Sequence, residues 1–389
     1  MDKMRPLRVL SIAHAAVKRH IGRLRYHPFA RAPEIEVHLV VPSRWREYGR
    51  AMTADPPDDP GAKVHIEPIW LPHIPLIKWY AHFYPRLGRT IRGINPDVIH
   101  LWEEPWSVVA MQAAFLKGGA ALVLEVDQNL IKRLPFPFEA IRHYVLARTA
   151  LILSRSDEAT AVVRAFGFAG PIRPIGYGVD QETFSPAASV RQQGGSLRVG
   201  YLGRLVEDKG LQDALLAIAR ARSPVSLAIM GEGPYRQRLE RHISELGLQQ
   251  RVNLRGWGGA PDAAQFLRSL DVSILLSRSS PNLLEQFGRT IIESQSCGVP
   301  VIGTDSGAIP NVIGDGGWVI PERDPTALAE LFDRLSATPE EVLSKKRFGL
   351  ANVASRFTYE KTAQILAEAW DHAASRRQCP EPKSARRTQ

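Results

Sequence analysis

The sequence predicts an α/β protein built from two doubly wound parallel sheets, and three observations support this. The chain has 389 residues, which suits two domains of ordinary size. Short β-rich apolar runs alternate with segments of helical length, as is typical of parallel βαβ units. The polar segment 185–196 interrupts the alternation, which then restarts. We therefore expect a linker between two Rossmann-like halves.

In the first half, the expected strands are short β-rich runs. The first of these is LRVLSIA at 7–13, followed by a loop at 14–20 that leads into a helix. The later strands are expected at 35–41, 63–70, 97–101, 120–126, 151–154 and 172–175. Helices are expected between them at 107–116, 138–147 and 157–166.

The second half repeats the pattern. Its helix at 234–246 has a proline in the first turn, where the missing N–H costs nothing. Strands are expected at 198–202, 226–230, 252–254, 272–276, 300–303 and 318–320. Helices are expected at 211–221, 234–246, 263–270, near Pro310, and at 326–335, 339–354 and 359–374. The domains are therefore predicted at 1–185 and 186–356, with a basic, disordered tail at 375–389.

Composition limits the class of protein. Cys297 and Cys379 are the only cysteines, so no disulfide framework and no cysteine metal cluster is expected. Neither a signal peptide nor an apolar run of spanning length is visible, and a cytoplasmic protein is expected. The net charge of +10 suits nucleic acid, an anionic membrane surface or an anionic substrate, or simply a solvated basic surface. No nucleic-acid reader motif occurs, so nucleic acid is not expected as a partner.

Two carboxylates eight residues apart, Glu285 and Glu293, frame a candidate site. A helix that starts near Phe287 would leave Glu285 on the preceding loop and place Glu293 about two turns inside. The N–H groups of such a helix start attract anions. A carboxylate at the mouth suits a sugar hydroxyl, and one further in suits a ribose diol. An ordinary surface helix with two solvated glutamates is the alternative.

A second motif, GRLVEDKG at 203–210, ends the first strand of this half. Gly203 lets the backbone approach a ligand, while Arg204 and Lys209 can hold a diphosphate. The spacing matches neither a P-loop nor a dinucleotide fingerprint. A charged βα loop without a ligand is the alternative.

Further glycine turns follow the neighbouring strands. Glu232 and Gly233 lie in GEGP after the next strand, and TDSGA at 304–308 follows the strand after Glu293. Because parallel strands end at the same edge of a sheet, these loops should lie together. Glycines, two cations and two carboxylates at one edge suit a nucleoside diphosphate that carries a sugar.

The ordered motifs resemble the retaining glycosyltransferases of family 4, which have the GT-B fold. The resemblance rests on GRLVEDKG, GEGP, E-x₇-E, CGVPVIGTDSG, DPTAL and the interdomain phrase GYGVDQETFSP, and extends over about residues 172–370. It implies two Rossmann-like domains facing a central cleft, with a C-terminal helix at about 357–374 crossing back onto the first domain. It also implies a nucleotide-sugar donor, no cofactor and no catalytic metal.

The resemblance implies roles for the residues that match its motifs. Arg204 and Lys209 would neutralise the diphosphate, Glu285 would contact the donor sugar, and Glu293 would hold the ribose. The stretch Phe287, Gly288, Arg289 and Thr290 would offer backbone N–H groups to the sugar or distal phosphate. No Asp-x-Asp metal motif occurs in a suitable place, which agrees with a metal-independent reaction.

The first half departs from the family pattern. Many members have a Gly-Gly loop after the first strand, where this chain has His14-Ala15-Ala16, and either Lys18 or Arg19 is a candidate to replace the lost phosphate contact. Where many members carry a histidine, this chain has Asp127, which is expected to orient the acceptor hydroxyl or act as its base. An N-cap role is the alternative for Asp127.

Glu103 and Glu104, within WEEPW after another strand, are candidates to bind acceptor hydroxyls. Two tryptophans, Trp102 and Trp106, flank them and could stack on a sugar. Structural aromatic residues are the alternative. With His14 and Lys18, these two carboxylates make up the predicted acceptor site.

The stretch from Trp70 to Pro85 mixes aromatic and apolar side chains with Lys78. Such a segment can lie in a membrane interface, which favours a lipid-linked or membrane-presented acceptor at the inner face of a membrane. A buried helix is the alternative.

The leading prediction is a retaining hexosyltransferase that acts on a glycan, a lipid-linked sugar or a small molecule. An epimerase or phosphorylase of the same fold is an alternative, although the only lysine between Lys132 and Lys345 is Lys209, already assigned to the diphosphate. A non-catalytic nucleotide-sugar-binding protein is the remaining alternative.

Overall fold

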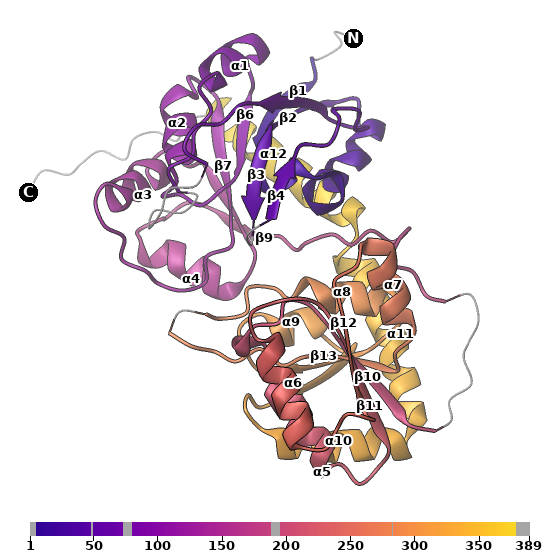
Figure 1. Cartoon of the computed structure of the whole chain (residues 1–389). Coiled ribbons are helices and arrows are strands. Elements are labelled where there is room, and N and C mark those ends of the chain that lie inside the picture. The colour runs from indigo at the N-terminus through magenta and orange to yellow at the C-terminus, as the bar shows by residue number, and fades with distance from the viewer. Residues whose placement is uncertain (1–4, 48–49, 73–79, 188–194, 282, 379–389) are drawn as a thin grey trace, which may run out of the picture. The chain divides into compact units, whose positions relative to one another are not determined.

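The computed structural model describes residues 5–47, 50–72, 80–187, 195–281 and 283–378 (Figure 1). Its contacts divide the chain into two compact units. The N-terminal unit runs to Ile175 and takes up the chain again from Thr362. The C-terminal unit is Gly176–Lys361. Each has its own buried core, so each is described by itself.

The N-terminal unit is organised by a seven-stranded parallel sheet in the order β5-β2-β1-β6-β7-β8-β9. Its central strand β1 pairs with β2 on one side and β6 on the other, so that Val9 lies opposite both Val37 and Val98. The strands are β1 Leu7–Ile12, β2 Ile35–Pro42, β5 Lys63–Glu67, β6 Val98–Trp102, β7 Ala121–Val126, β8 Leu151–Ser154 and β9 Ile172–Pro174. The central strands are apolar almost throughout because helices cover both faces.

Helices α1, α2 and α3 pack side by side in this unit, and α12 lies against its sheet (Figure 1). Helices α2 and α4 begin at serine caps: the Ser107 hydroxyl accepts the N–H of Ala110, and that of Ser156 accepts the N–H of Ala159. The helices are α1 Leu87–Ile94, α2 Val108–Leu116, α3 Phe138–Leu146, α4 Asp157–Ala165 and α12 Tyr359–Gln378.

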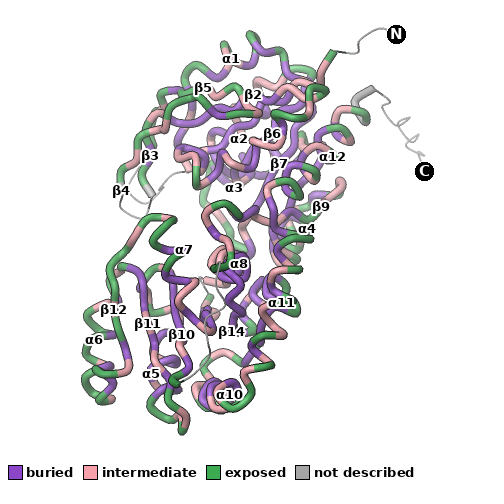
Figure 2. Tube along the Cα trace, turned by 90° about the vertical axis from the view of Figure 1, so that its right-hand side faces the viewer, coloured by how far each residue is buried: buried purple, intermediate pink, exposed green. Residues whose placement is uncertain are grey.

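The C-terminal unit has a six-stranded parallel sheet in the order β12-β11-β10-β13-β14-β15. Its strands are β10 Leu197–Leu202, β11 Val225–Met230, β12 Val252–Arg255, β13 Val272–Leu275, β14 Val301–Thr304 and β15 Gly317–Ile320. Figure 2 shows β10, β11 and β14 mostly buried, whereas the edge strand β12 is largely accessible. Helices α5, α6 and α10 pack together, as do α7, α8 and α11. The helices are α5 Leu211–Arg220, α6 Arg236–Glu245, α7 Ala260–Arg268, α8 Arg289–Ser296, α9 Ile309–Ile313, α10 Pro325–Ala337 and α11 Pro339–Arg356.

Several local expectations were wrong or incomplete. The segment from His14 onward does not form an α-helix: short 3-10 or π-helical segments occupy His14–Val17, Arg19–Arg23 and Leu24–Arg31, and the last contains Pro28. The sequence reading missed α1 and the antiparallel hairpin β3 Arg44–Glu47 and β4 Arg50–Thr53. These elements are short, and short periodic patterns are weak signals.

The predicted boundary at 185 also differs from the structure. Residues 176–185 belong to the C-terminal unit, where Val179 bridges Thr358 and Phe184 lies in the core. The linker at 185–196 and the tail at 375–389 lie largely outside the described residues.

Residues from Thr362 onward pack with the N-terminal unit. Trp370 on α12 is fully buried there, stacks on Phe29 with ring centroids 5.1 Å apart, and contacts the ring of His100. None of the helices in the described part of the chain is long and apolar enough to cross a membrane.

We expect Trp370→Ala to lower the free energy of unfolding of the N-terminal unit by about 3–5 kcal/mol, because the change leaves a cavity under α12. Urea unfolding followed by circular dichroism measures the loss. The control is Trp257→Ala, whose ring is 50% exposed and should cost far less. Equal effects of the two substitutions would contradict the packing role of Trp370.

Candidate functional site

The candidate donor site lies where the strand order of the C-terminal sheet reverses. The chain runs from β10 to β11 and β12 on one side, and from β13 to β14 and β15 on the other. The loops after β10 and β13 therefore leave the carboxyl edge side by side. This switch point is the usual ligand position in open α/β sheets.

Lys209 reaches this point from a short turn, Glu207–Lys209, after β10. Gly210 ends the turn with a φ of +65°, and a Cβ there would come within 2.0 Å of the Leu276 carbonyl oxygen. Only glycine fits this position, because the chain must turn and press against the next strand at once. The Lys209 ammonium forms an ion pair with Glu285 and lies 3.3 Å from the Ser277 hydroxyl oxygen.

Glu285 is held by two donors. Ser277, just after β13, donates its hydroxyl to Glu285 Oε2 at 2.6 Å, and the Lys209 ammonium donates to the same oxygen. Burial favours the neutral acid, but the charge of Lys209, its hydrogen bond, the Ser277 hydroxyl and the charge of Arg204 outweigh it. The pKa of Glu285 is therefore lowered, and the site holds an ionised carboxylate.

Arg204 is exposed beside this cluster, and its charge acts on Glu285. The backbone around it is packed tightly. A Cβ on Gly231 would lie 1.8 Å from the Gly203 carbonyl oxygen, and one on Gly233 would lie 2.1 Å from that of Leu205. The glycines of both motifs therefore let two neighbouring loops touch, and the adjoining Arg204 side chain faces solvent.

Helix α8 begins at Arg289, two residues later than predicted, because Gly288 adopts a left-handed conformation with φ 78° as its N-cap. Glu293 consequently lies just over one turn inside, not two. Burial raises the pKa of Glu293 against the charge of Arg289. Phe287 is buried, and Thr290 lies in the first turn of the helix.

Arg289 lies 5.3 Å from the centre of the Tyr177 ring, which itself meets Phe287 edge to face. Glu232 is exposed and pairs with Arg236 at 3.4 Å, while its carbonyl accepts the N–H of Leu205. Glu232 therefore lies at the solvent-exposed periphery of the candidate donor site and does not contact Glu285.

The sequence reading did not include Ser277 among the site residues, although its hydroxyl fixes Glu285. It also missed Glu322, which accepts hydrogen bonds from the backbone N–H and hydroxyl of Ser279, and Arg278, which pairs with Asp213 at 2.6 Å. A serine after a strand is the only local signal for such a role, and it is weak.

The N-terminal sheet has its own switch point between β1 and β6. His14 follows β1 and Glu103 follows β6, and the His14 Nδ1 lies 2.6 Å from Glu103 Oε1. His82 Nε2 lies 3.6 Å from the same oxygen. Burial alone would raise the pKa of Glu103, but His14 and His82 outweigh it and lower the pKa to about 2.

Glu104 points elsewhere and holds the loop after β7. Its Oε1 accepts the backbone N–H groups of Asp127 and Gln128, both at 2.8 Å. Burial raises the pKa of Glu104 to about 7. Asp127 accepts from Arg155 at 2.8 Å, and Lys18 pairs with Asp55 at 2.7 Å. The predicted acceptor residues thus share one edge but form separate clusters.

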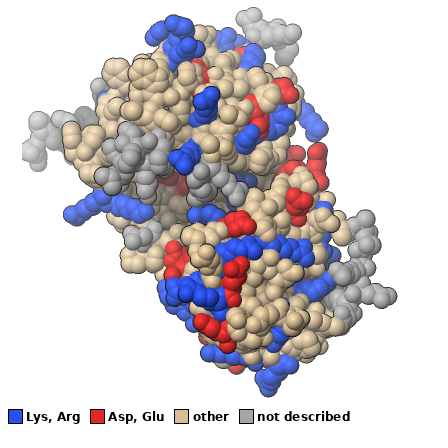
Figure 3. All heavy atoms as spheres, viewed as in Figure 1, with Lys and Arg blue, Asp and Glu red and all other residues tan. Residues whose placement is uncertain are grey.

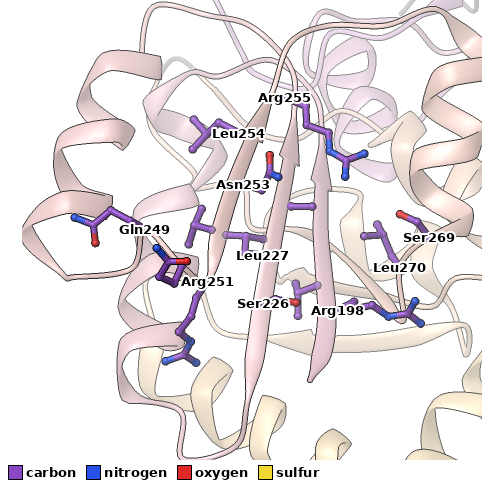
Figure 4. A pocket seen from close by; sticks show the side chains of 14 residues that line it. Arg198, Ser226, Leu227, Gln249, Arg251, Asn253, Leu254, Arg255, Ser269 and Leu270 are labelled. Atoms are coloured by element: carbon purple, nitrogen blue, oxygen red, sulfur yellow. The ribbon is translucent and has the colours of Figure 1, made fainter. Parts of the chain in front are cut away.

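A hollow of about 580 Å³ lies on the face of the C-terminal sheet (Figure 4). Among the residues that line this hollow, Figure 4 shows Ser226 on β11 and both Asn253 and Arg255 on β12. Arg198 on β10 and Ser269 at the end of α7 also line it. Neither Lys209 nor Glu285 lines it. On the side of the C-terminal unit shown in Figure 3, acidic and basic side chains are interspersed, so no large patch of one sign stands out in that view.

Family models match both halves of the chain. The model described as "Glycosyltransferase Family 4" matches residues 29–183, and "Glycosyl transferases group 1" matches residues 187–349. The fold and the charged loops at each switch point define a GT-B glycosyltransferase architecture. The chain belongs to the family 4 type of GT-B glycosyltransferases.

Individual relatives share only a limited part of this sequence. The chain is 30% identical over 251 residues to the D-inositol 3-phosphate glycosyltransferase of Streptomyces bingchenggensis, with 58% of this chain and 53% of the relative covered. The match thus spans about half the length of that relative.

Two solved structures share the fold. Sucrose-phosphate synthase from Thermosynechococcus elongatus has a TM-score of 0.72 at 18% identity, with 95% of this chain and 99% of that one covered. Anabaena HepE in complex with UDP-glucose has a TM-score of 0.66 at 18% identity, covering 94% and 99%.

We expect Glu104→Gln to stabilise the protein at alkaline pH. An acid with a raised pKa contributes stability below its unfolded pKa, and that stability is lost as the pH rises through about 7. The amide can still accept both loop N–H groups but carries no charge. The variant should therefore exceed the wild type by about 3 kcal/mol at pH 8 and by much less at pH 5.

Thermal unfolding at both pH values measures the difference, with Glu139→Gln, a more exposed acid, as control. A difference between wild type and E104Q that stays constant from pH 5 to pH 8 would contradict the buried, titrating carboxyl.

Proposed function

We propose that this protein transfers a hexose from a nucleoside diphosphate sugar to a hydroxyl of an acceptor, with retention of the anomeric configuration. The observation that carries the proposal is the Lys209–Ser277–Glu285 cluster at the switch point of the C-terminal sheet. It combines a cation for phosphate with an ionised carboxylate for sugar hydroxyls.

Lys209 and Arg204 are proposed to hold the diphosphate. The leaving group gains charge as the bond to the sugar breaks, and fixed cations stabilise that charge without reorganisation. Lys209 is already positioned by Glu285 and Ser277, so the ammonium is preorganised. These contacts would let the reaction proceed without a metal at the diphosphate and without a cofactor.

Glu285 and the start of α8 are proposed to bind the sugar. The ionised Glu285 carboxylate accepts hydrogen bonds from sugar hydroxyls, which are neutral donors. The backbone N–H groups that lead into α8, from Phe287 to Thr290, suit the distal phosphate. Glu293, about one turn further along, is proposed to hold the ribose diol. Gly203, Glu232 and Gly233 shape the rim of this donor site.

Retention is proposed to follow from attack on the same face that the diphosphate leaves, through a short-lived oxocarbenium-like ion pair. Glu285 is proposed as a positioning group for the sugar rather than a nucleophile, because its Oε2 is already occupied by Lys209 and Ser277.

The acceptor, sugar-containing or lipid-linked, is proposed to meet the carboxyl edge of the N-terminal sheet. Glu104 and Asp127 together shape the loop after β7 there, and Lys18, His14 and Glu103 flank β1 and β6. Asp127 remains a candidate to orient the acceptor hydroxyl, although one oxygen is bound to Arg155.

We expect Lys209→Ala to reduce sugar transfer by about 10²–10³-fold, because it removes one preorganised cation from the developing diphosphate charge. Calorimetry with UDP, GDP and ADP first identifies the nucleotide, and a coupled assay then measures transfer. Lys345→Ala, a lysine on helix α11 that takes no part in the Lys209–Ser277–Glu285 cluster, is the matched control and should retain full activity.

Two results would contradict the proposal. One is full activity of the K209A variant, which would remove Lys209 from the mechanism. The other is nucleoside diphosphate binding that is abolished by a chelator, which would overturn metal-free recognition of the donor. NMR of the first-formed product reports the anomer and also separates transfer from epimerisation or phosphorolysis.

An anionic membrane surface is the proposed setting, at the cytoplasmic face. Part of the predicted interfacial stretch, 73–79, lies outside the described residues, but Trp70 beside it is 61% exposed. A second segment supports the proposal: Ile131 and Phe136 are 65% and 87% exposed, and Lys132 and Arg133 lie between them. Apolar side chains beside bases suit an anionic interface.

We expect the double substitution Ile131→Ser with Phe136→Ser to weaken co-sedimentation with phosphatidylglycerol vesicles at least several-fold. The physical reason is the loss of two apolar side chains that would enter the interface. Phe115→Ser is the matched control, since that ring is 76% exposed on α2. Vesicle binding of the double variant equal to that of the wild type would refute the role of this segment.

A further inference from the structure

Three potential metal ligands converge at the switch point of the N-terminal sheet. His14 comes from the turn after β1, Glu103 from the end of β6, and His82 from the segment before α1. One ligand atom from each lies within 4.8 Å of the other two. The three residues are distant in sequence, so the fold itself assembles them.

The carboxylate of Glu103 is the centre of this cluster. Its side chain is fully buried, and its Oε1 receives the His14 ring at 2.6 Å and the His14 backbone N–H at 3.3 Å. Its Oε2 is also buried and has no hydrogen-bond partner among the residues that the structure describes. A buried carboxylate oxygen without a partner is costly, so a bound species there would offset a real penalty.

Aromatic packing fixes both imidazoles. The Trp45 ring lies 4.5 Å from the His14 ring, tilted by 34°, and meets the His82 ring edge-on at 5.0 Å. The Tyr84 ring also meets the His82 ring edge to face, with centroids 6.0 Å apart. Rings held in this way keep their nitrogen atoms directed at Glu103, which is the preorganisation a metal site requires.

We propose that His14, His82 and Glu103 form a binding site for a zinc-class divalent transition metal. Two imidazoles and one carboxylate are ligands suited to such ions, and three protein ligands leave a further position for water or another oxygen ligand. The assignment goes beyond the proposed function, which names His14 and Glu103 only as residues at the acceptor edge and places no metal there. The donor cluster lies in the other unit.

The distances define what metal binding requires. Bonds of about 2.0–2.1 Å in tetrahedral geometry place two ligand atoms about 3.3 Å apart. The His82–Glu103 separation of 3.6 Å is close to this, whereas the His14–Glu103 hydrogen bond at 2.6 Å must lengthen and lose its proton. Metal binding should therefore release a proton. The His14 side chain is 20% exposed, which gives the ion a route to the cluster.

Equilibrium dialysis of the tag-free full-length protein with Zn²⁺ tests the site, and Co²⁺ absorption reports its geometry. We expect one equivalent of Zn²⁺, a visible spectrum typical of four- or five-coordinate Co²⁺, and proton release in calorimetry across two buffers. His14→Gln should weaken binding at least ten-fold, and Glu103→Gln and His82→Gln should abolish it.

The matched control is His143→Gln, which removes an exposed imidazole that also lies beside a carboxylate, Glu139. This variant should bind the metal like the wild type. Absence of binding by the wild type, or binding unchanged by H14Q, would overturn the site. His14 is partly exposed, so H14Q decides the question even if the variants of the two buried residues fail to fold.

Discussion

Both units depend on one constraint of parallel sheets. At a switch point the chain continues from two neighbouring strands toward opposite sides of the sheet, so the loops after those strands lie together at the carboxyl edge, where ligands bind. In each unit, a basic side chain that follows one of these strands lies beside a carboxylate that follows the other. Lys209 and Glu285 span β10 and β13, and His14 and Glu103 span β1 and β6. The same geometry thus produces a lysine–carboxylate cluster, the proposed donor site, in one unit and an imidazole–carboxylate cluster in the other.

At the carboxyl edges of both sheets, each of these carboxylates is already paired with a basic side chain in the absence of a ligand. Glu285 remains ionised because Lys209, Ser277 and Arg204 outweigh its burial. Removing either partner would leave a desolvated charge, so the pair maintains both groups in place. A ligand that brings its own phosphates and hydroxyls can then engage each group without a large rearrangement.

Beneath the N-terminal edge, a buried ion-pair network supports the loops. Glu125 on β7 accepts both terminal nitrogens of Arg25 at 2.8 Å and also pairs with Arg155, which in turn holds Asp127. Burial and the two arginines lower the pKa of His100, so a neutral imidazole packs beside Trp370. The returning helix α12 therefore rests on the same network that positions the loop after β7.

The sequence by itself determined the two-sheet fold, most helices and strands, and the grouping of Arg204, Lys209 and Glu285, because strand periodicity and glycine-rich loops are local signals. Tertiary structure alone decided the contacts that depend on pairing between distant segments. Three contacts are of this kind: the Ser277 hydroxyl donates to Glu285, His82 lies beside Glu103, and Glu104 accepts the backbone N–H of Asp127. The unit boundary at Ile175 was also decided there, since Val179 pairs with Thr358. No spacing along the chain encodes such contacts, because they form only when strands from distant parts of the chain are laid side by side.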